Sequence, residues 1–205
     1  MKNIIFDLDG TLSDTIKATA QAIREVGGKY NLPELTDERI RAAMGLADME
    51  FYAFLFPGIQ GLGQIGQEID AIEEDAIRRI KAGMLFPGVA EMLEELHKAG
   101  HKLYIASTGN TDHVSATVVS AGIEQYFTKI SCNRPEKISM VKELIAGSDK
   151  SNWLMVGDMF KDSEAAKGNG ITALGAAFGY LKPKDHTLFD AILQKPCDIF
   201  THIVE

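Results

Sequence analysis

Hydrophobic and polar residues follow two different patterns along the chain, and the change between them falls near residue 85. After one short apolar run at residues 3–6, the first part of the chain shows helical spacing of its apolar positions. From Pro87 onward, helical stretches alternate with short apolar runs. This alternation is typical of a parallel sheet with crossover helices. We therefore predict an α/β fold, in which a parallel sheet carries a small helical domain inserted after its first strand.

The predicted sheet consists of short runs that are rich in β-branched and aromatic residues. Asn3–Phe6 is too short for a helix, which favours a buried strand. Five further strands are predicted, the last at an edge of the sheet: 101–106, 127–132, 153–156, 172–178 and 197–203. We expect residues 1–13 and 85–205 to form the core domain.

Residues 14–84 are predicted to form the helical domain. Ser13 or Asp14 is expected to cap a helix that runs to about Gly28. A second helix is expected from Thr36, with an interruption at Gly45. A charged helix with one apolar stripe is predicted over residues 67–81.

The segment Gly61–Gly66 reads GLGQIG, which formally matches a dinucleotide-binding motif. It follows an aromatic segment and a Pro-Gly turn instead of a strand, and no acidic residue ends a second strand about 20 residues later. We interpret the segment as a loop.

Polar side chains follow several of the predicted strands. In parallel sheets ligands bind beyond the carboxyl ends of the strands, where these side chains would meet. The residues in question are Asp7 and Asp9 after the first strand, Ser107 and Thr108 after the second, and Asp158 with Asp162 after the fourth. Ionised carboxylates at the margin of a core require a cation, hydrogen-bond donors or chemistry to compensate them.

A phosphate ester would explain each of these residues. A carboxylate that attacks an anionic phosphoryl group is repelled by it, and cations must cancel that repulsion. Asp7, Asp158 and a backbone carbonyl would suit Mg²⁺, which prefers oxygen ligands. The Ser107 hydroxyl and the backbone N–H groups of Ser107 and Thr108 could bind phosphoryl oxygens.

A lysine would supply the remaining positive charge. Lys137, at the start of the helix after the third predicted strand, is the best placed, with Lys129 and Lys142 as alternatives.

Composition narrows the range of partners. The 205 residues carry a net charge of −8, which argues against nucleic acid. With 45% hydrophobic and 24% charged residues and no apolar stretch near the ~20 residues of a membrane span, we expect a cytoplasmic protein without a membrane partner. The expected partner is a small phosphorylated metabolite, and a monomer is favoured.

The chain resembles the haloacid-dehalogenase-like phosphohydrolases over essentially its whole length. FDLDGTLSD resembles the first motif of that family, LYIAST the second, the lysine of EKISMV the third and VGDMFKDSEAAKGNGI the fourth, in the same order and spacing. Phe86-Pro87-Gly88-Val89 matches the form that carries a helical cap after the first motif. The resemblance implies a Rossmann-like core and a helical cap domain.

The resemblance also implies a Mg²⁺-dependent phosphatase that works through an aspartyl-phosphate. Asp7 would be the nucleophile and Asp9 the acid and base. The metal would lie at Asp7, Asp9 and Asp158, while Thr11 would hold the loop and Asp162 would orient metal-bound water or Lys137. The dehalogenases and phosphonate-cleaving members lack the second aspartate, so Asp9 argues against their chemistry.

Two alternatives remain beside hydrolysis. Sugar-phosphate mutases of the same fold use a histidine in the first cap helix and an arginine in the cap loop, where this chain has Thr19 and Asp48. That departure favours hydrolysis. A catalytically inactive binding or scaffolding protein is disfavoured, because every charged catalytic position is filled.

Substrate specificity is expected to come from residues 45–56. Arg39 and Arg41 are candidates for binding a carboxylate. The aromatic residues of this region are interpreted as the cap's own core more than as a substrate wall: Phe51, Tyr52, Phe54 and Phe56. All five histidines are interpreted as structural or surface residues: His97, His101, His113, His186 and His202.

Overall fold

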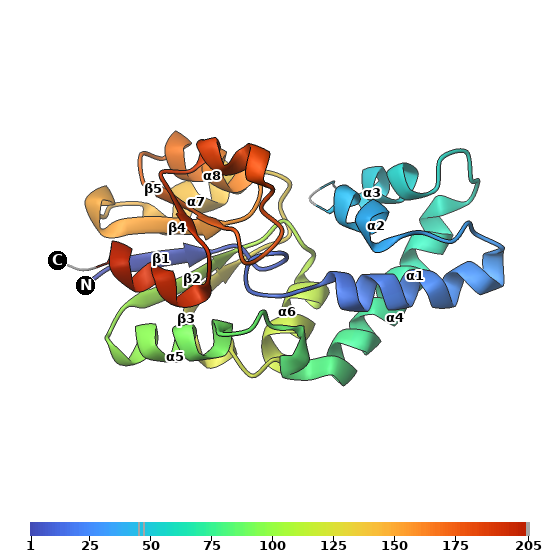
Figure 1. The fold of residues 1–205 in the computed structure, drawn as a ribbon, viewed down its shortest axis with the longest axis horizontal. Coiled ribbons are helices and arrows are strands. Elements are labelled where there is room, and N and C mark those ends of the chain that lie inside the picture. The colour runs from blue at the N-terminus through green and yellow to red at the C-terminus, as the bar shows by residue number, and fades with distance from the viewer. Residues whose placement is uncertain (45, 47, 204–205) are drawn as a thin grey trace.

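The computed structural model describes residues 1–44, 46 and 48–203, and within them six strands form one parallel sheet in the order β3-β2-β1-β4-β5-β6 (Figure 1). The strand bounds are β1 Asn3–Phe6, β2 Lys102–Ala106, β3 Phe127–Ser131, β4 Trp153–Gly157, β5 Thr172–Ala176 and β6 Ala191–Leu193. The first strand lies between β2 and β4, so the chain order reverses at its carboxyl end. Such a switch point is where sheets of this kind bind ligands.

The continuous apolar run of β1 reflects burial on both faces. Ile4 and Phe6 point into the cluster beneath α5 (Val89–Lys98) and α6 (Thr111–Ser120), whereas Ile5 points into the opposite cluster. The helices that cover the second face are α7 (Lys137–Ile145) and α8 (Phe160–Gly168). Figure 1 shows one helix pair on each side of the sheet. Burial of both faces is typical of a parallel sheet.

Residues 16–84 form a helical insert between β1 and β2, which lies beside the sheet in Figure 1. Its elements are α1 (Ile16–Tyr30), α2 (Asp37–Ala43), α3 (Asp48–Leu55), α4 (Leu62–Ile80) and the 3₁₀ helix η1 (Lys81–Met84). The insert has its own apolar cluster, in which Tyr52 and Phe56 are buried. Within the described residues, no helix combines the length and apolar character needed to cross a bilayer.

Two backbone segments join the insert to the core side by side. The N–H of Asp14 donates to the Met84 carbonyl at 2.6 Å, and the N–H of Phe86 donates to the Leu12 carbonyl at 3.1 Å. The position of the insert is therefore fixed next to the loop that follows β1.

The predicted caps of the first helix are wrong. The helix begins at Ile16, and neither Ser13 nor Asp14 caps it. The Ile16 N–H donates instead to the hydroxyl of Tyr180 at 2.9 Å, and that hydroxyl donates to Asp14 at 2.7 Å. An acceptor 164 residues away along the chain therefore replaces the local cap, which no local pattern could indicate.

The loop interpretation of GLGQIG is also wrong, because α4 begins at Leu62. Gly66 lies in the helix where a Cβ would come within 2.6 Å of the Tyr52 ring. This glycine allows close packing of α3 on α4. The segment does not follow a strand, so its rejection as a dinucleotide motif stands.

The predicted edge strand at residues 197–203 is a 3₁₀ helix, η5 (Pro196–His202). Pro196 opens it, and Asp198 accepts the N–H groups of Gln194 and Lys195. The edge is instead β6, whose three residues pair with β5. A strand this short carries little periodicity.

Candidate active site

The loop after β1 carries the carboxylates of Asp7 and Asp9, which point in different directions. The Asp7 N–H donates to the Val156 carbonyl at 2.9 Å, which aligns Asp7 with the end of β4. Gly10 has a φ of +87°, and a Cβ there would lie 2.6 Å from an oxygen of Asp158. A side chain at position 10 would therefore displace the neighbouring carboxylate.

Three carboxylates converge at the carboxyl ends of β1 and β4. Oxygens of Asp7, Asp158 and Asp162 lie within 4.8 Å of one another, and all three residues are buried. Lys137, at the first position of α7, places Nζ 2.6 Å from Asp7 and 2.6 Å from Asp162. Lys129 and Lys142 are exposed on β3 and α7. The structure thus brings Lys137, and neither alternative, to the cluster.

Asp162 is fully engaged in this arrangement. Its second oxygen accepts the backbone N–H groups of Asp158 and Met159, at 3.1 and 2.9 Å. The absence of a side chain at Gly157 makes room for it, since a Cβ there would lie 2.3 Å from the Asp162 side chain. Asp162 therefore holds the loop after β4 and the ammonium of Lys137.

One lysine does not balance three buried carboxylates. Burial and the charge of Asp162 raise the pKa of Asp7 to about 7, against the opposing effect of Lys137. Burial and the charge of Asp7 raise the pKa of Asp158 well above its usual value. Among the described residues, Oδ2 of Asp158 is the buried side-chain oxygen without a hydrogen-bond partner, while Oδ1 accepts from Thr11 at 2.6 Å. These oxygens fit a hard divalent cation such as Mg²⁺.

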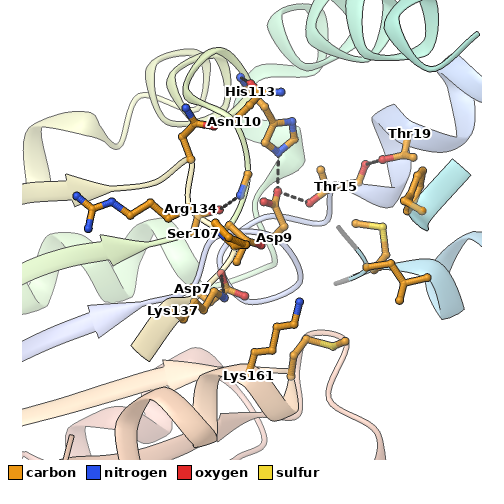
Figure 2. Close-up of a pocket in the computed structure, with 18 of the residues that line it drawn as sticks. Asp7, Asp9, Thr15, Thr19, Ser107, Asn110, His113, Arg134, Lys137 and Lys161 are labelled. Carbon is orange, nitrogen blue, oxygen red and sulfur yellow. Dashed lines mark hydrogen bonds and ion pairs between the residues drawn. The ribbon is translucent and has the colours of Figure 1, made fainter. Parts of the chain in front are cut away.

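Asp9 points away from this cluster, toward the helical insert. Its Oδ1 accepts from the Thr15 hydroxyl at 2.8 Å and lies 2.8 Å from Nε2 of His113 (Figure 2). Burial acts to raise the pKa of Asp9, but His113 and Thr15 outweigh it and the pKa lies below its usual value. Among the described residues, the carboxylate group that could hold a metal ion consists of Asp7, Asp158 and Asp162, and the Asp9 side chain is not part of it.

His113 is the functional residue that the sequence reasoning missed. Burial would lower its pKa, but Asp9 and Glu73 raise it to about 10, so the ring is an imidazolium at neutral pH. The ring lines the cavity and is largely buried against Asp9, so the surface interpretation is wrong for this histidine. Asn110 caps α6 by accepting the His113 N–H at 2.8 Å. The sequence did contain a signal for this residue: a histidine three residues after the cap of a helix that follows a strand of the sheet.

Ser107 and Thr108 line the same cavity. The buried Ser107 hydroxyl accepts the Gly109 N–H at 3.1 Å and retains a proton to donate. The Ser107 N–H, predicted to bind phosphate, donates instead to the Ser131 carbonyl at 3.0 Å. The hydroxyl is therefore the group that Ser107 offers to a ligand.

The cavity has a volume of about 460 Å³ and lies between the sheet edge and the insert. The insert contributes aromatic, hydroxyl and acidic side chains, and the core contributes carboxylates, hydroxyls, amides and cations. Besides the residues already described, its lining includes Thr19, Phe51, Tyr52, Asp70 and Glu73 from the insert, and Asn133, Arg134 and Lys161 from the core.

The predicted specificity region contributes to the cavity only in part. Phe51 and Tyr52 line it and also pack in the insert. The guanidinium of Arg39 lies over the Phe54 ring and that of Arg41 over the Tyr180 ring, which occupies both groups. Gly45, Ala47 and the side chain of Asp48 lie outside the described residues.

Comparisons with known proteins show which family the chain resembles. The family model for haloacid dehalogenase-like hydrolases matches residues 4–176. A phosphoglycolate phosphatase from Caulobacter vibrioides is 26% identical over 202 residues, which cover 90% of this chain and 83% of that protein.

Solved structures share the fold at lower identity. A haloacid dehalogenase-like hydrolase from Streptococcus pneumoniae superposes with a TM-score of 0.87 at 23% identity, over 100% of this chain and 99% of that one. A β-phosphoglucomutase from Clostridium difficile superposes with a TM-score of 0.78 at 15% identity, over 99% of this chain and 95% of that one. These likenesses show the fold alone.

The chain belongs to the haloacid dehalogenase-like hydrolase family, since the family model covers most of its length. The predicted family and the predicted α/β class with a parallel sheet are confirmed.

Removal of one carboxylate from the cluster should stabilise the metal-free protein. Folding raises the pKa of the Asp158 carboxyl. The folded protein therefore loses stability as the pH rises from the pKa of the unfolded state, about 4, through the pKa of the folded state. Asp158→Asn should therefore raise the free energy of unfolding in chelator at pH 8 by about 1–3 kcal/mol, with a smaller gain at pH 5.

Urea unfolding in chelator at both pH values measures this gain. Asp75→Asn, at an exposed ion pair on α4, is the matched control and should change stability little. A wild-type protein more stable than Asp158→Asn at pH 8 without metal would show that the cluster is compensated within the chain.

Proposed function

We propose that this protein is a phosphatase that hydrolyses small phosphate monoesters through an aspartyl-phosphate on Asp7. The observation that carries the proposal is the placement of two differently supported carboxylates at one cavity. Asp7 lies against Lys137 in the acidic cluster, while Asp9 lies against His113 and Thr15. One carboxylate is thus suited to attack and the other to proton transfer.

Asp7 is the proposed nucleophile. One of its oxygens attacks phosphorus, an aspartyl-phosphate bond forms and the bond from phosphorus to the alcohol oxygen breaks. Lys137 and the Ser107 hydroxyl hold the phosphoryl oxygens. Mg²⁺, held by Asp7, Asp158 and the backbone carbonyl of Asp9, would supply positive charge. That charge would reduce the repulsion between the Asp7 carboxylate and the phosphate, which are both anions.

Asp9 is the proposed acid and base. The Asp9–His113 pair carries one exchangeable proton, and the negative charge of an entering phosphate favours its transfer to Asp9. Asp9 gives this proton to the departing alcohol oxygen and then takes one from the water that attacks the aspartyl-phosphate. That second attack releases inorganic phosphate and restores Asp7. Thr11 and Asp162 support the cluster through Asp158 and Lys137.

Residues 14–84, which are the insert and the two residues before it, are proposed to act as a cap over this site. A cap limits access of water and selects the alcohol part of the substrate. A phosphate-transferring mutase is the weaker proposal, because Thr19 binds Glu73 in the position where a mutase histidine is expected. The cytoplasmic location and the monomeric state stay predictions.

Substitution of the nucleophile tests the covalent step. Asp7→Asn keeps the side-chain volume but removes the attacking charge, so kcat for p-nitrophenyl phosphate should fall by about 10³-fold or more. Asp112→Asn, an exposed position on α6, is the control and should retain wild-type rates. A folded, Mg²⁺-loaded Asp7→Asn protein that turns over at a substantial rate would exclude the covalent role.

Metal removal tests the acidic cluster as a cation site. Chelation should lower kcat by about 10²–10³-fold, and Mg²⁺ should restore it better than Ca²⁺, whose bonds are longer and less directional. Mg²⁺ should also raise the melting temperature of the wild type and not that of Asp158→Asn. Full activity in excess chelator would contradict the proposal.

Removal of the His113 ring tests its role as a positioning residue for Asp9. In His113→Ala, kcat should fall about 10- to 100-fold for an alkyl phosphate, whose leaving group needs a proton. The loss should be smaller for p-nitrophenyl phosphate, which needs none, with KM little changed in both cases. His97→Ala, which removes a ring packed on Tyr126, is the control. Equal losses with both esters would indicate a merely structural role for His113.

A further inference from the structure

Tyr180 lies where the core meets the insert. It comes from the loop after β5, yet its buried ring packs in the apolar cluster of the insert. The ring packs edge-on against Phe86, in the second connecting segment, with the ring centroids 5.7 Å apart. The guanidinium of Arg41, on α2, lies 4.5 Å from the centre of the same ring. One core side chain therefore contacts both a connecting segment and a helix of the insert.

The polar groups of Tyr180 hold both ends of the loop that leads from β1 to α1. Its N–H donates to the Gly10 carbonyl at 3.0 Å. Its hydroxyl accepts the Ile16 N–H at 2.9 Å and donates to Asp14 at 2.7 Å. The two backbones can approach this closely because Gly179 has no side chain: a Cβ there would lie 1.8 Å from the Gly10 carbonyl oxygen. Both ends of the loop are thus fastened to one residue.

Thr15 is the part of this loop that contacts the proposed acid and base. The N–H that the Tyr180 hydroxyl accepts belongs to the peptide group between Thr15 and Ile16. The Thr15 hydroxyl has one proton and two acceptors near it, Asp9 at 2.8 Å (Figure 2) and the Ser13 carbonyl at 3.4 Å. The contact with Asp9 is the shorter one while this peptide group is held in place. A shift of the peptide group would move the hydroxyl relative to both acceptors.

We propose that Tyr180 is a positioning residue for Asp9, which acts by holding the peptide group after Thr15 through its hydroxyl. This inference rests on the proposed phosphatase function, because it requires Asp9 to transfer protons. Tyr180 is not among the described residues that line the cavity, so we expect it to affect proton transfer and not the binding of phosphate. A small misplacement of a reacting group is enough to slow the step that uses it.

Tyr180→Phe tests the role of the hydroxyl, because the ring and the backbone N–H remain. Two esters of similar shape are compared with the intact, Mg²⁺-loaded protein. The leaving group of phenyl phosphate must take up a proton at neutral pH, whereas that of p-nitrophenyl phosphate needs none. We expect kcat to fall about 10-fold for phenyl phosphate and about 2-fold or less for p-nitrophenyl phosphate, with KM little changed for both.

Tyr30→Phe is the matched control. The Tyr30 hydroxyl also donates to a carboxylate, that of Glu68 at 2.6 Å, and it lies at the other end of α1. Its loss should leave the rates with both esters at the wild-type level. Asp14→Ala removes the acceptor of the Tyr180 hydroxyl and should give a smaller loss in the same direction, so the test survives if Tyr180→Phe is unstable.

A double-mutant cycle tests whether the effect runs through Thr15. Thr15→Val keeps the shape of the side chain and removes the hydroxyl proton that Asp9 accepts. In the Thr15→Val background, Tyr180→Phe should lower kcat for phenyl phosphate by no more than about 2-fold, because the contact it supports is already absent. A merely structural tyrosine would give two independent losses that multiply.

Each result decides between the proposals. Equal losses with both esters, wild-type rates in both Tyr180→Phe and Asp14→Ala, or losses that multiply in the double mutant would overturn the positioning role and leave the phosphatase function standing. Failure of the wild type to hydrolyse any of a panel of small phosphate esters that includes these two would overturn the phosphatase function, and the positioning role with it.

Discussion

The arrangement of the site depends on a single ammonium group held among three buried carboxylates. Lys137 reaches Asp7 and Asp162 from the start of α7, and Asp162 in turn binds the backbone after β4, next to Asp158. The remaining negative charge raises the pKa values of Asp7 and Asp158. A protein gains no stability from such a cluster, and its retention is typical of a site that receives a cation and an anion during its work.

The position of the first motif at the end of a buried strand could be predicted from the sequence because its pattern is local. β1 is a continuous apolar run, and Asp7 and Asp9 follow it within three residues. Parallel strands bring their carboxyl ends together, so Ser107, Lys137 and Asp158 could be placed at one sheet edge from strand order alone. The fold class followed from the same alternation of helices and short strands.

What the sequence did not show depends on contacts between distant elements. The hydroxyl of Tyr180 replaces the expected cap of α1, and β6 is too short to show a period. His113 was interpreted as a structural or surface residue, and only the packing of α6 against α4 brings it close to Asp9 and Glu73. Tertiary position therefore decides which side chain lies against the proposed acid and base.

Direct detection of the covalent intermediate tests the central claim most closely. The protein is mixed with a rapidly cleaved phosphate ester and Mg²⁺, quenched in acid within the first turnover, digested and analysed by mass spectrometry. We predict a phosphoryl group on Asp7 in the peptide that contains Asp7 to Asp14, and none in the Asp7→Asn protein. An active enzyme that releases phosphate while Asp7 never carries a phosphoryl group at any time point would contradict the account.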